Sequence, residues 1–488
     1  MFSSRRIILE VIRGNIKGYV PARYILAVLG SIGMAIVYGL KVNLSVALVG
    51  MLNHTALMAC TFLIEPCLNS EADGPFVWST DIQGIVLSCY FWGYLVSQIP
   101  GGRLAELFSA KWVMFFSVTI NVVCTLLTPI MVELHYFWLV LMRVLEGIGG
   151  GVTFPGMHVL LSKWAPPQER SVMASLVYAG TSLGTVISIF MAGMLTATAG
   201  WESVFYVMGG LSAIWCFLWV ALVQDSPQQQ PLISIEEREM IVKSLGGKSG
   251  EGPKKKMPVP WRAVATSAPF LAILVAHVCS NWGWYMMLIE LPFYMKQVLK
   301  FNMKENATAT ALPFLTLWFF SMSLSKTLDW LRGRKTITTS TARKIATLFA
   351  SLVPAVCLLI LCYIGNNRFA AVVIMTIAVT CVGGMFCGFL SNHIDIAPNF
   401  AGTLIALTNT VATLPGIVVP IFVGALTHDN QTISAWRIIF FVTIGLYAIE
   451  ILAYTFFGSG EEQPWNKVPQ ENNDPENKPL KKDQKSSV

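Results

Sequence analysis

Long runs of apolar residues, each broken by charge, proline or a glycine cluster, fill most of this chain of 488 residues. Charged residues make up only 12%, about half of the roughly 25% that is usual in soluble domains. A helix that crosses a bilayer needs about 20 apolar residues. We predict twelve spans, near residues 22–50, 80–106, 111–132, 136–161, 170–198, 201–223, 266–298, 308–331, 343–364, 369–392, 400–427 and 435–458. The sequence therefore predicts an all-α membrane protein with twelve transmembrane helices.

Lysine and arginine residues collect in alternate connections, and this asymmetry sets the orientation of the spans. The basic connections are the N-terminal segment, the loop with Lys163 and Arg170, the 224–262 linker and the loop from Arg332 to Lys344. The 51–79 loop contains no lysine or arginine. We therefore expect both termini in the cytoplasm. The net charge of +7 then marks the cytoplasmic surface and favours membrane lipid over nucleic acid as a partner.

Three N-x-T sequences, at Asn53, Asn306 and Asn430, fall in connections that this orientation places outside the cell or in a lumen. Such sequences accept glycans on exposed loops, so we predict a glycoprotein. Cys60 and Cys67 share the first of these loops. They form either a small disulfide in an oxidising lumen or two free thiols.

The chain repeats parts of its own sequence at a long interval. The stretches from Trp201 to Ala213 and from Trp436 to Ala448 share six identities in one register. A second pair of matching triplets follows the second and eighth spans: Gly102, Glu106, Lys111 and Ser325, Asp329, Arg334. Such internal duplication is typical of transporters that bind substrate near the midplane, between two halves of the molecule.

We predict two pseudo-symmetric six-helix bundles from this repeat. The predicted parts are a cytoplasmic N-terminus (1–21), the first bundle (22–223), a cytoplasmic linker (224–265), the second bundle (266–458) and a disordered cytoplasmic tail (459–488). A short amphipathic helix is expected in the linker, near Ser234 to Leu245.

Lys41, Arg143 and Glu146 are ionisable residues inside predicted spans. A charge at bilayer depth costs several kcal/mol unless it is paired or hydrated, so it usually faces a cavity and has a function there. Two of the three are positive, which predicts a buried pocket that attracts an anion. Arg143 and Glu146 are three residues apart, so their side chains can meet on one helix face. Glu146 is then either a proton or sodium carrier or one half of a fixed ion pair.

Several segments resemble the major facilitator superfamily and, within it, the anion transporters that include sialin, the vesicular glutamate transporters and the sodium/phosphate cotransporters. The segments that carry this resemblance are NLSVA at 43–47, FWGY at 91–94, QIPGG at 98–102, GVTFP at 151–155, KWAPP at 163–167, NH at 392–393, DIAP at 395–398 and GEEQPW at 460–465. The segment NTVATLPG at 409–416 is most similar to sialin-like members.

The resemblance implies that Lys41 and Arg143 hold the carboxylate or phosphate of a substrate. Relatives usually have an arginine in place of Lys41, and lysine cannot make the flat two-pronged contact of arginine. Sialin and the glutamate transporters have a glutamate that is thought to take the coupling proton where this chain has Gly150. Leu87 and Ser280 replace a histidine and an arginine of the vesicular transporters. These departures argue against glutamate transport by their coupling mechanism.

Two further groups of residues are expected around the substrate path. Aromatic and polar residues of the spans are candidates for the cavity wall: Tyr38, Tyr90, Tyr94, Phe154, Asn281 and Trp282. The repeated loop charges and two residues at the end of the tenth span are candidates for an inner gate: Gly102, Glu106, Lys111, Asp329, Arg334, His393 and Asp395.

These features predict a secondary active transporter of anions, either inorganic phosphate or organic carboxylates, that works by alternating access. The coupling ion is expected to be Na⁺ or H⁺, with no other cofactor, and the protein is expected to be a monomer in the plasma membrane or a lysosomal or vesicular membrane. The alternatives are a non-transporting receptor or scaffold on the same fold and an uncoupled facilitator or exchanger. No nucleophile stands beside a base in the sequence and no metal-ligand spacing occurs among the cysteines, so we do not expect an enzyme.

Overall fold

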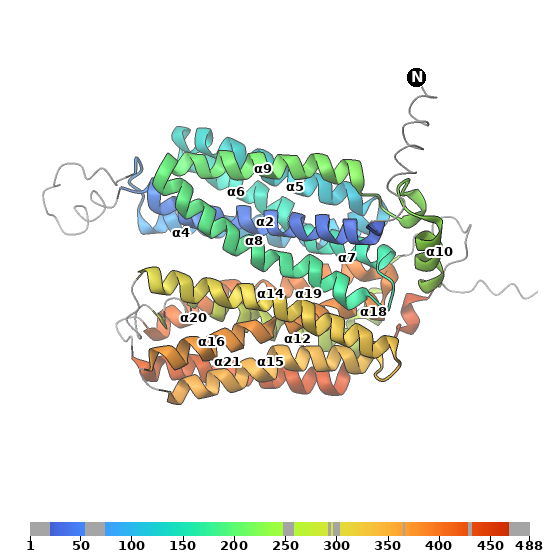
Figure 1. The fold of residues 1–488 in the computed structure, drawn as a ribbon. Coiled ribbons are helices and arrows are strands. Elements are labelled where there is room, and N and C mark those ends of the chain that lie inside the picture. The colour runs from blue at the N-terminus through green and yellow to red at the C-terminus, as the bar shows by residue number, and fades with distance from the viewer. Residues whose placement is uncertain are drawn as a thin grey trace, which may run out of the picture.

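The computed structural model describes residues 20–53, 74–246, 258–290, 294–295, 303–364, 367–427 and 432–467. Long helices in these ranges form two layers, one from each half of the chain (Figure 1). Eleven of the helical segments in the described residues are long and apolar enough to cross a membrane. A further helix, α14 (Met303–Gly333), has 31 residues and packs in the second bundle against α16. The predicted helical membrane body is confirmed.

Each bundle contains six helical spans. The first bundle contains α2 (Ala22–Met51), α4 (Thr80–Leu107), α5 (Ala110–Leu134), α6 (Tyr136–Gly151) with α7 (Thr153–Trp164), α8 (Arg170–Ala199) and α9 (Trp201–Leu222). The second contains α12 (Ala268–Tyr285), α14, α15 (Thr339–Tyr363), α16 (Arg368–Val382) with α17 (Gly384–Cys387) and α18 (Phe389–Ile396), α19 (Ala401–Ala412) with α20 (Pro415–Thr427), and α21 (Ile433–Phe457).

Three spans that we predicted as continuous helices are interrupted. The fourth breaks at Val152 between α6 and α7, and the eleventh breaks between α19 and α20, where Pro415 begins the new helix. The tenth breaks twice, at Gly383 and Gly388. Proline has no N–H to donate, and non-helical backbone at membrane depth is tolerated where it is buried in protein. The fourth and tenth spans occupy corresponding places in the two halves, so both halves carry a break beside their shared interface.

The seventh span differs from its predicted extent of 266–298. Its α-helix α12 ends at Tyr285, and a π-helical turn, η2 (Met286–Glu290), follows. Such turns are rare and often occur at functional sites. The change of helix type falls next to the cavity that is described below.

The linker begins with a 3₁₀ turn, η1 (Pro227–Gln229), and the predicted short helix is α10 (Ile235–Ser244). Ser234 caps α10 by accepting a hydrogen bond from the Glu237 N–H, and a further short helix, α11 (Trp261–Ala265), precedes α12. Arg23, at the start of α2, donates to Glu169 at 2.7 Å and to Glu237 at 2.9 Å. The pair with Glu237 holds α10 against the first bundle. We call the end of the molecule where α10 lies the linker end.

The chain after α21 is ordered for longer than we predicted. Gly460 N–H donates to Ser340 Oγ at 2.7 Å, and Gln463 N–H donates to the Ile396 carbonyl at 2.8 Å. A 3₁₀ turn, η4 (Pro464–Asn466), follows, and Asn466 accepts from the N–H of Asn399 in a second 3₁₀ turn, η3 (Pro398–Phe400). The prediction of a disordered tail from residue 459 is therefore wrong up to Lys467, because the backbone here finds partners on α15 and α18.

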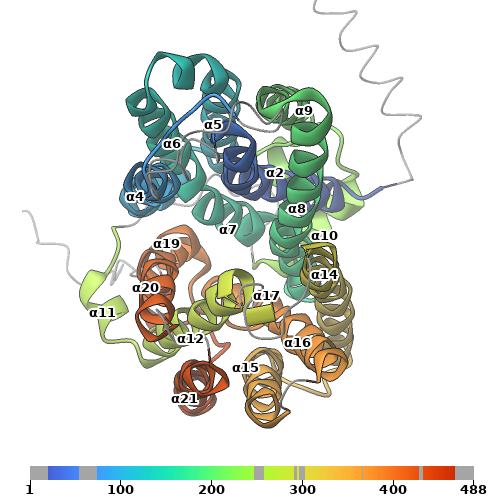
Figure 2. The same ribbon diagram turned by 90° about the vertical axis from the view of Figure 1, so that its left-hand side faces the viewer.

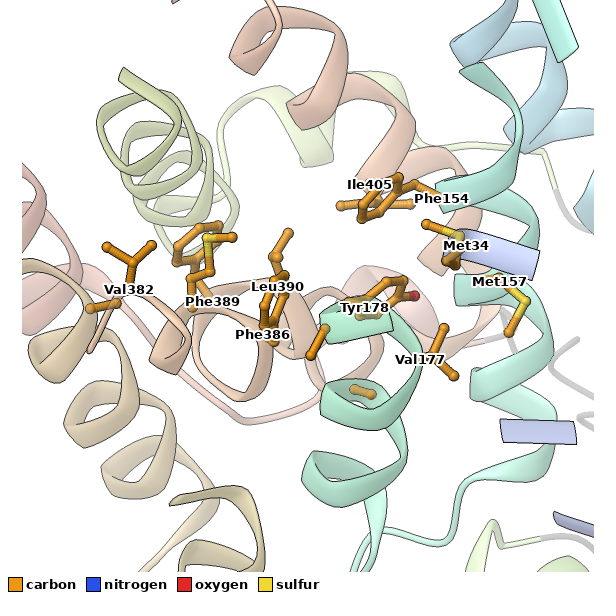
Figure 3. Packing of buried hydrophobic residues seen from close by; sticks show 14 of the residues in the cluster. Met34, Phe154, Met157, Val177, Tyr178, Val382, Phe386, Phe389, Leu390 and Ile405 are labelled. Carbon is orange, nitrogen blue, oxygen red and sulfur yellow. The ribbon is translucent and has the colours of Figure 1, made fainter. Parts of the chain in front are cut away.

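Buried hydrophobic residues of both bundles meet in one core. Figure 3 shows Met157 and Tyr178 of the first bundle on one side and Phe386 and Leu390 of the second on the other. In the end-on view of Figure 2, α7 and α8 face the second bundle, where α19, α14 and α17 lie opposite them. Large apolar side chains on the outer surfaces, such as Phe217 and Phe456, stay exposed, as expected for a surface that lies in lipid.

Two predicted glycan acceptors lie at the end opposite to α10, and one lies outside the described residues. Asn53 follows α2 directly, and its N–H donates to the Phe76 carbonyl at 2.9 Å. Asn306 lies in the first turn of α14 instead of the loop that we predicted, because this helix begins five residues before the predicted span. Asn430, Cys60 and Cys67 lie outside the described residues.

Candidate substrate site and gate

Arg143 and Glu146 form the ion pair that their spacing predicts. The two side chains are 3% and 2% exposed, and Nη1 of Arg143 lies 2.6 Å from Oε2 of Glu146. Arg143 also donates to two backbone carbonyls of α2, at Leu40 (3.3 Å) and Lys41 (2.7 Å). Glu146 accepts a second hydrogen bond from Thr125 at 2.8 Å. Both carboxylate oxygens are therefore occupied, and the pair ties α6 to α2 and α5.

Lys41 has no carboxylate partner among the described residues. Its ammonium nitrogen lies among four aromatic rings instead, 4.4 Å from the ring centre of Phe91, 5.3 Å from Tyr38, 5.5 Å from Tyr90 and 5.7 Å from Tyr94. Cation–π attraction to such rings is worth about 0.5–2 kcal/mol each. The rings hold the ammonium group in place without neutralising its charge.

Tyr90 lies between the two cations. Its ring centre is 5.5 Å from Lys41 Nζ and also 5.5 Å from the guanidinium carbon of Arg143. Its hydroxyl group is buried without a hydrogen-bond partner in the described part of the chain. The ring stacks on Tyr94, with centroids 5.9 Å apart. Tyr90 therefore connects the charged cluster to the wall of the cavity.

A cavity lies between the two bundles, with an empty volume of about 480 Å³ when its open mouth is included. It is lined from α2, α4, α7 and α8 of the first bundle and from α12, α17, α18 and α19 of the second. Four of the eight predicted binding residues line it: Tyr38, Tyr94, Phe154 and Asn281. Lys41, Arg143, Tyr90 and Trp282 do not.

The two cations lie behind the cavity wall in this conformation. Tyr38 and Tyr94 belong both to the aromatic cage of Lys41 and to the lining of the cavity, so they stand between the ammonium group and the open space. Trp282 points elsewhere, because its indole N–H donates to Thr443 of α21 at 3.2 Å.

A hydrogen bond crosses the cavity between the bundles. Asn409 Nδ2 of α19 donates to the hydroxyl oxygen of Tyr94 of α4 at 2.9 Å. Asn281 donates to the Ala412 carbonyl at 2.8 Å and thereby orients the end of α19. Asn409 was not predicted as a site residue from the sequence, although it begins the NTVATLPG segment. Trp284, Tyr285 and Thr413 also line the cavity and were missed.

Glu106 and Asp329, the repeated acidic residues, each cap a helix of the opposite bundle. Glu106 at the end of α4 accepts from the N–H and the hydroxyl of Thr403, the third residue of α19, both at 2.6 Å. Asp329 of α14 accepts from the N–H of Val172, the third residue of α8, at 3.0 Å. A carboxylate at a helix N-terminus gains from both the free N–H groups and the helix dipole. The same kind of contact, a carboxylate that caps a helix of the opposite bundle, therefore joins the two bundles twice at the linker end. We call the Glu106–Thr403 and Asp329–Val172 contacts the linker-end lock.

Gly102 has a packing role in this lock. A Cβ at residue 102 would lie 2.6 Å from the carbonyl oxygen of Gly402, closer than real Cβ atoms come to other atoms. Helices α4 and α19 can approach this closely because residue 102 is a glycine.

Lys111 and Arg334, the predicted basic members of the gate, do not join the two bundles. Lys111 donates to the Val220 carbonyl and to Gln224 beside the first bundle. Arg334, the residue after α14, lies over the ring of Trp330 of that helix at 4.0 Å. The carboxylates instead pair with arginines three residues away, Glu106 with Arg103 and Asp329 with Arg332.

Asp395 is the centre of a buried ion-pair cluster across the bundle interface. Its two oxygens lie 2.7 Å from Arg170 of α8 and 2.6 Å from Arg343 of α15. Arg343 also donates to the hydroxyl of Ser171 in the first bundle at 2.8 Å. Asp395 was predicted in the gate from the sequence, but Arg170, the first residue of α8, and Arg343 were not.

His393 lies two residues before Asp395 on α18. Its ring nitrogens contact the Leu390 carbonyl at 3.0 Å and the Thr408 hydroxyl at 2.9 Å. His158 of α7 is its neighbour across the bundle interface, with ring centroids 5.6 Å apart. The predicted gate residues Gly102, Glu106, Asp329, His393 and Asp395 thus all lie at the bundle interface.

Two helical membrane bundles with a cavity between them and ion-pair contacts at one end define a membrane transporter and not an enzyme. The family model of the Major Facilitator Superfamily matches residues 25–420. Human sialin is 39% identical over 453 residues, which cover 91% of this chain and 90% of that protein. The chain belongs to the major facilitator superfamily, in the group of sialin, the inorganic phosphate cotransporters and the vesicular glutamate transporters.

Other relatives are also similar over most of this chain. A Drosophila melanogaster protein named "Putative inorganic phosphate cotransporter" is 37% identical and covers 91% of this chain and 86% of its own length. Human vesicular glutamate transporter 2 is 34% identical, with 91% and 75% covered. Among solved structures, the proton:xylose symporter XylE matches with a TM-score of 0.66 at 14% identity and covers 90% of this chain and 97% of its own. At that identity, this match shows the fold alone.

Proposed function

We propose that the protein is a secondary active transporter of small anions, either inorganic phosphate or organic carboxylates, that works by alternating access with a coupling cation. The names of its relatives, which include sialin, an inorganic phosphate cotransporter and vesicular glutamate transporters, support an anionic substrate.

The unpaired charge of Lys41 is the observation on which this proposal mainly rests. Lys41 and Arg143 contribute two positive charges and Glu146 one negative charge, so one positive charge is left over in this cluster. An uncompensated charge at bilayer depth costs several kcal/mol. An anion that enters from the cavity supplies the missing counter-charge, and this gives the site its preference for anions over neutral solutes.

Access to Lys41 requires the aromatic wall to move. Tyr94 both shields the ammonium group and accepts the hydrogen bond from Asn409 of the second bundle. When an anion displaces the Tyr94 ring from Lys41, it also strains the bond that joins the bundles. Substrate binding is thereby linked to the relative position of the two halves, as alternating access requires.

Opening of the linker end is the second step of the proposed transport cycle. The Glu106–Thr403 contact, the Asp329–Val172 contact and the Asp395 cluster close one end of the interface. All of them consist of hydrogen bonds and ion pairs that water can replace. A rigid-body rotation of one bundle against the other would exchange them for hydrated groups and open a path to the linker side.

A coupling cation is required if the anion accumulates against the membrane potential. Moving one negative charge inward against 100 mV costs about 2.3 kcal/mol, so the cation must supply at least that. We propose H⁺ or Na⁺ as the cation and assign Glu146 the role of a fixed partner of Arg143, because both of its oxygens are already bonded.

In this proposal both termini and the linker face the cytoplasm, and the protein acts as a monomer in the plasma membrane or a lysosomal or vesicular membrane. Uptake of labelled phosphate, sialic acid and glutamate into proteoliposomes, under separate sodium and pH gradients, tests the proposal. Saturable uptake of at least one anion supports it. No uptake of any anion under either gradient would instead support a receptor or scaffold on the transporter fold.

A further inference from the structure

Glu450 is a second acidic residue within a membrane span, and it has no part in the substrate site or the gate. It lies in α21, seven residues before the end of this helix, and its side chain is fully buried, with 0% exposed. Oε1 accepts a hydrogen bond from Ser280 of α12 at 2.8 Å. Oε2 is buried without a hydrogen-bond partner in the described part of the chain.

No cation among the described residues reaches this carboxyl group. Cys279 and Ser280 face it from α12, and Tyr447, one turn earlier on its own helix, has a buried hydroxyl with no partner. Arg343, on the neighbouring helix α15, is bound to Asp395. The other charged residue of α15, Lys344, is its neighbour at the start of that helix, and α20 has no ionisable residue.

A comparison with Glu146 indicates the protonation state of Glu450. Glu146 is buried to the same degree, but Arg143 neutralises it and both of its oxygens accept hydrogen bonds. An ionised carboxylate without a partner is far too costly to bury, so such a group takes up a proton and becomes neutral. In the conformation described here, Glu450 meets this condition and Glu146 does not.

A metal ion fits this place poorly. Cations such as Na⁺ are usually coordinated in transporters by unwound backbone carbonyls and helix ends. Around Glu450, α12 and α21 are continuous helices, so their carbonyls are used within the helix. Ser280 and Tyr447 alone would leave most of the coordination sphere of a sodium ion empty.

Glu450 is connected to the cavity through α12. His277 and Asn281 of α12 line the cavity, and Ser280, which lies between them in sequence, bonds to Glu450 on an adjoining face of the helix. A neutral Glu450 lets α12 and α21 pack in contact. A charged Glu450 would draw water between them and displace the cavity-lining face of α12.

Building on the proposed function, we propose that Glu450 is the site that binds the coupling proton. Its carboxylate takes up one proton from one side of the membrane, remains neutral and buried while substrate crosses, and releases the same proton when α12 and α21 separate toward the other side. Ser280 is a positioning residue that holds one carboxyl oxygen, so that the proton resides on the other.

Infrared spectroscopy of the purified full-length protein in lipid tests the proton directly. The carbonyl stretch of a protonated carboxylic acid is separate from that of a carboxylate. We expect this band at neutral pH in the wild type, its loss in Glu450→Gln, and its retention in the matched variant Glu146→Gln. A band that is unchanged in Glu450→Gln would overturn the assignment.

Transport supplies a second and independent readout. For one proton per substrate, a gradient of about one pH unit raises steady-state accumulation about tenfold. We expect this ratio in the wild type and in Glu133→Gln, the same change at an exposed carboxylate of α5. In Glu450→Gln the ratio should fall to about one. A preserved tenfold response in Glu450→Gln would overturn the proposal. If the wild type transported no anion but its infrared band still depended on Glu450, the proton site would stand and the transport function would fail.

Discussion

The hydroxyl oxygen of Tyr90 stands where the first side-chain atom of residue 150 would be if Gly150 were any other amino acid. A Cβ there would be closer to this oxygen than the 3.0 Å that real Cβ atoms keep, and it would lie 3.0 Å from Cζ of the same ring. Tyr90 in turn lies between Lys41 and Arg143. The site of this chain is therefore built around an aromatic ring at the place where the resemblance to sialin would put a glutamate.

This contact predicts a specific double-mutant cycle. Gly150→Ala should destabilise the protein by about 1–3 kcal/mol, the usual cost of overpacking a buried site. In the background of Tyr90→Phe, the same change should cost clearly less, because the clashing hydroxyl group is gone. Thermal unfolding of the four proteins in detergent measures the coupling. Strictly additive effects would show that residues 90 and 150 do not contact each other.

Lys41 is expected to be essential for uptake as a positive charge and not as a packing element. Lys41→Met keeps a long side chain within the aromatic cage but removes the charge, so uptake of the transported anion should fall at least about tenfold, which corresponds to about 1.4 kcal/mol. Lys41→Arg should retain uptake within about tenfold, because a guanidinium group also binds aromatic faces. Initial rates in proteoliposomes give both values.

A control for the loss of one positive charge is Lys326→Met, at an exposed position of α14. It should leave uptake unchanged. Equal activity of Lys41→Met and the wild type would remove Lys41 from the substrate path.

Variants of the Arg143–Glu146 pair should affect the stability of the protein and its transport activity differently. Glu146→Gln leaves Arg143 buried without its counter-charge, and breaking a buried pair costs about 3–5 kcal/mol. Replacing both residues by leucine should restore much of the lost stability, since buried pairs are often no better than well-packed apolar residues. The double variant should nevertheless transport nothing, because the cation at position 143 is gone. Thermal unfolding and uptake, measured on the same preparations, check the two parts. Normal uptake by the double variant would show that substrate does not need Arg143.

The linker end should open when Gly102 and Gly402 can no longer approach each other. Gly102→Leu places side-chain atoms against the Gly402 carbonyl and should hold α4 and α19 apart. A cysteine at Ala406, a buried position next to Gly102, should then react several-fold faster with a membrane-impermeant maleimide applied from the linker side. Gly193→Leu, at a glycine of α8 with open space around it, is the matched control and should not change the labelling rate. Unchanged labelling in Gly102→Leu would mean that this contact does not close the gate.

Much of the fold could be predicted from the sequence because a bilayer imposes a local rule. Each span must be long, apolar and helical, so Ala22–Met51 and Ile433–Phe457 were located within two residues at each end. The breaks at Val152 and Gly383 could not be predicted in this way. They depend on how α7 and α17 pack against the opposite bundle, and no pattern within one span contains that information.

The same limit applied to the site. The repeated spacing around Glu106 and Asp329 marked the gate, because duplication leaves a trace in the sequence. The partners of Asp395 could not be predicted, since Arg170 and Arg343 lie 225 and 52 positions away. Arg170 reaches it across the bundle interface, and Arg343 reaches it through the packing of α15 against α18 within the second bundle. Glu450 was missed for a related reason. That no cation of the described segments reaches it is a property of the packed structure, and a single acidic residue in an apolar run does not reveal it.

The bonds from Arg23 to Glu169 and Glu237 join the first part of the linker to the first bundle, so the two should move together. Because Glu237 of α10 is bonded to Arg23 at the start of α2, and Arg23 is also bonded to Glu169 in the loop before α8, a rotation of that bundle carries α10 with it. The part of the linker that bends during this rotation must then lie after α10. A molecule that binds α10 would therefore slow the movement of the whole first bundle.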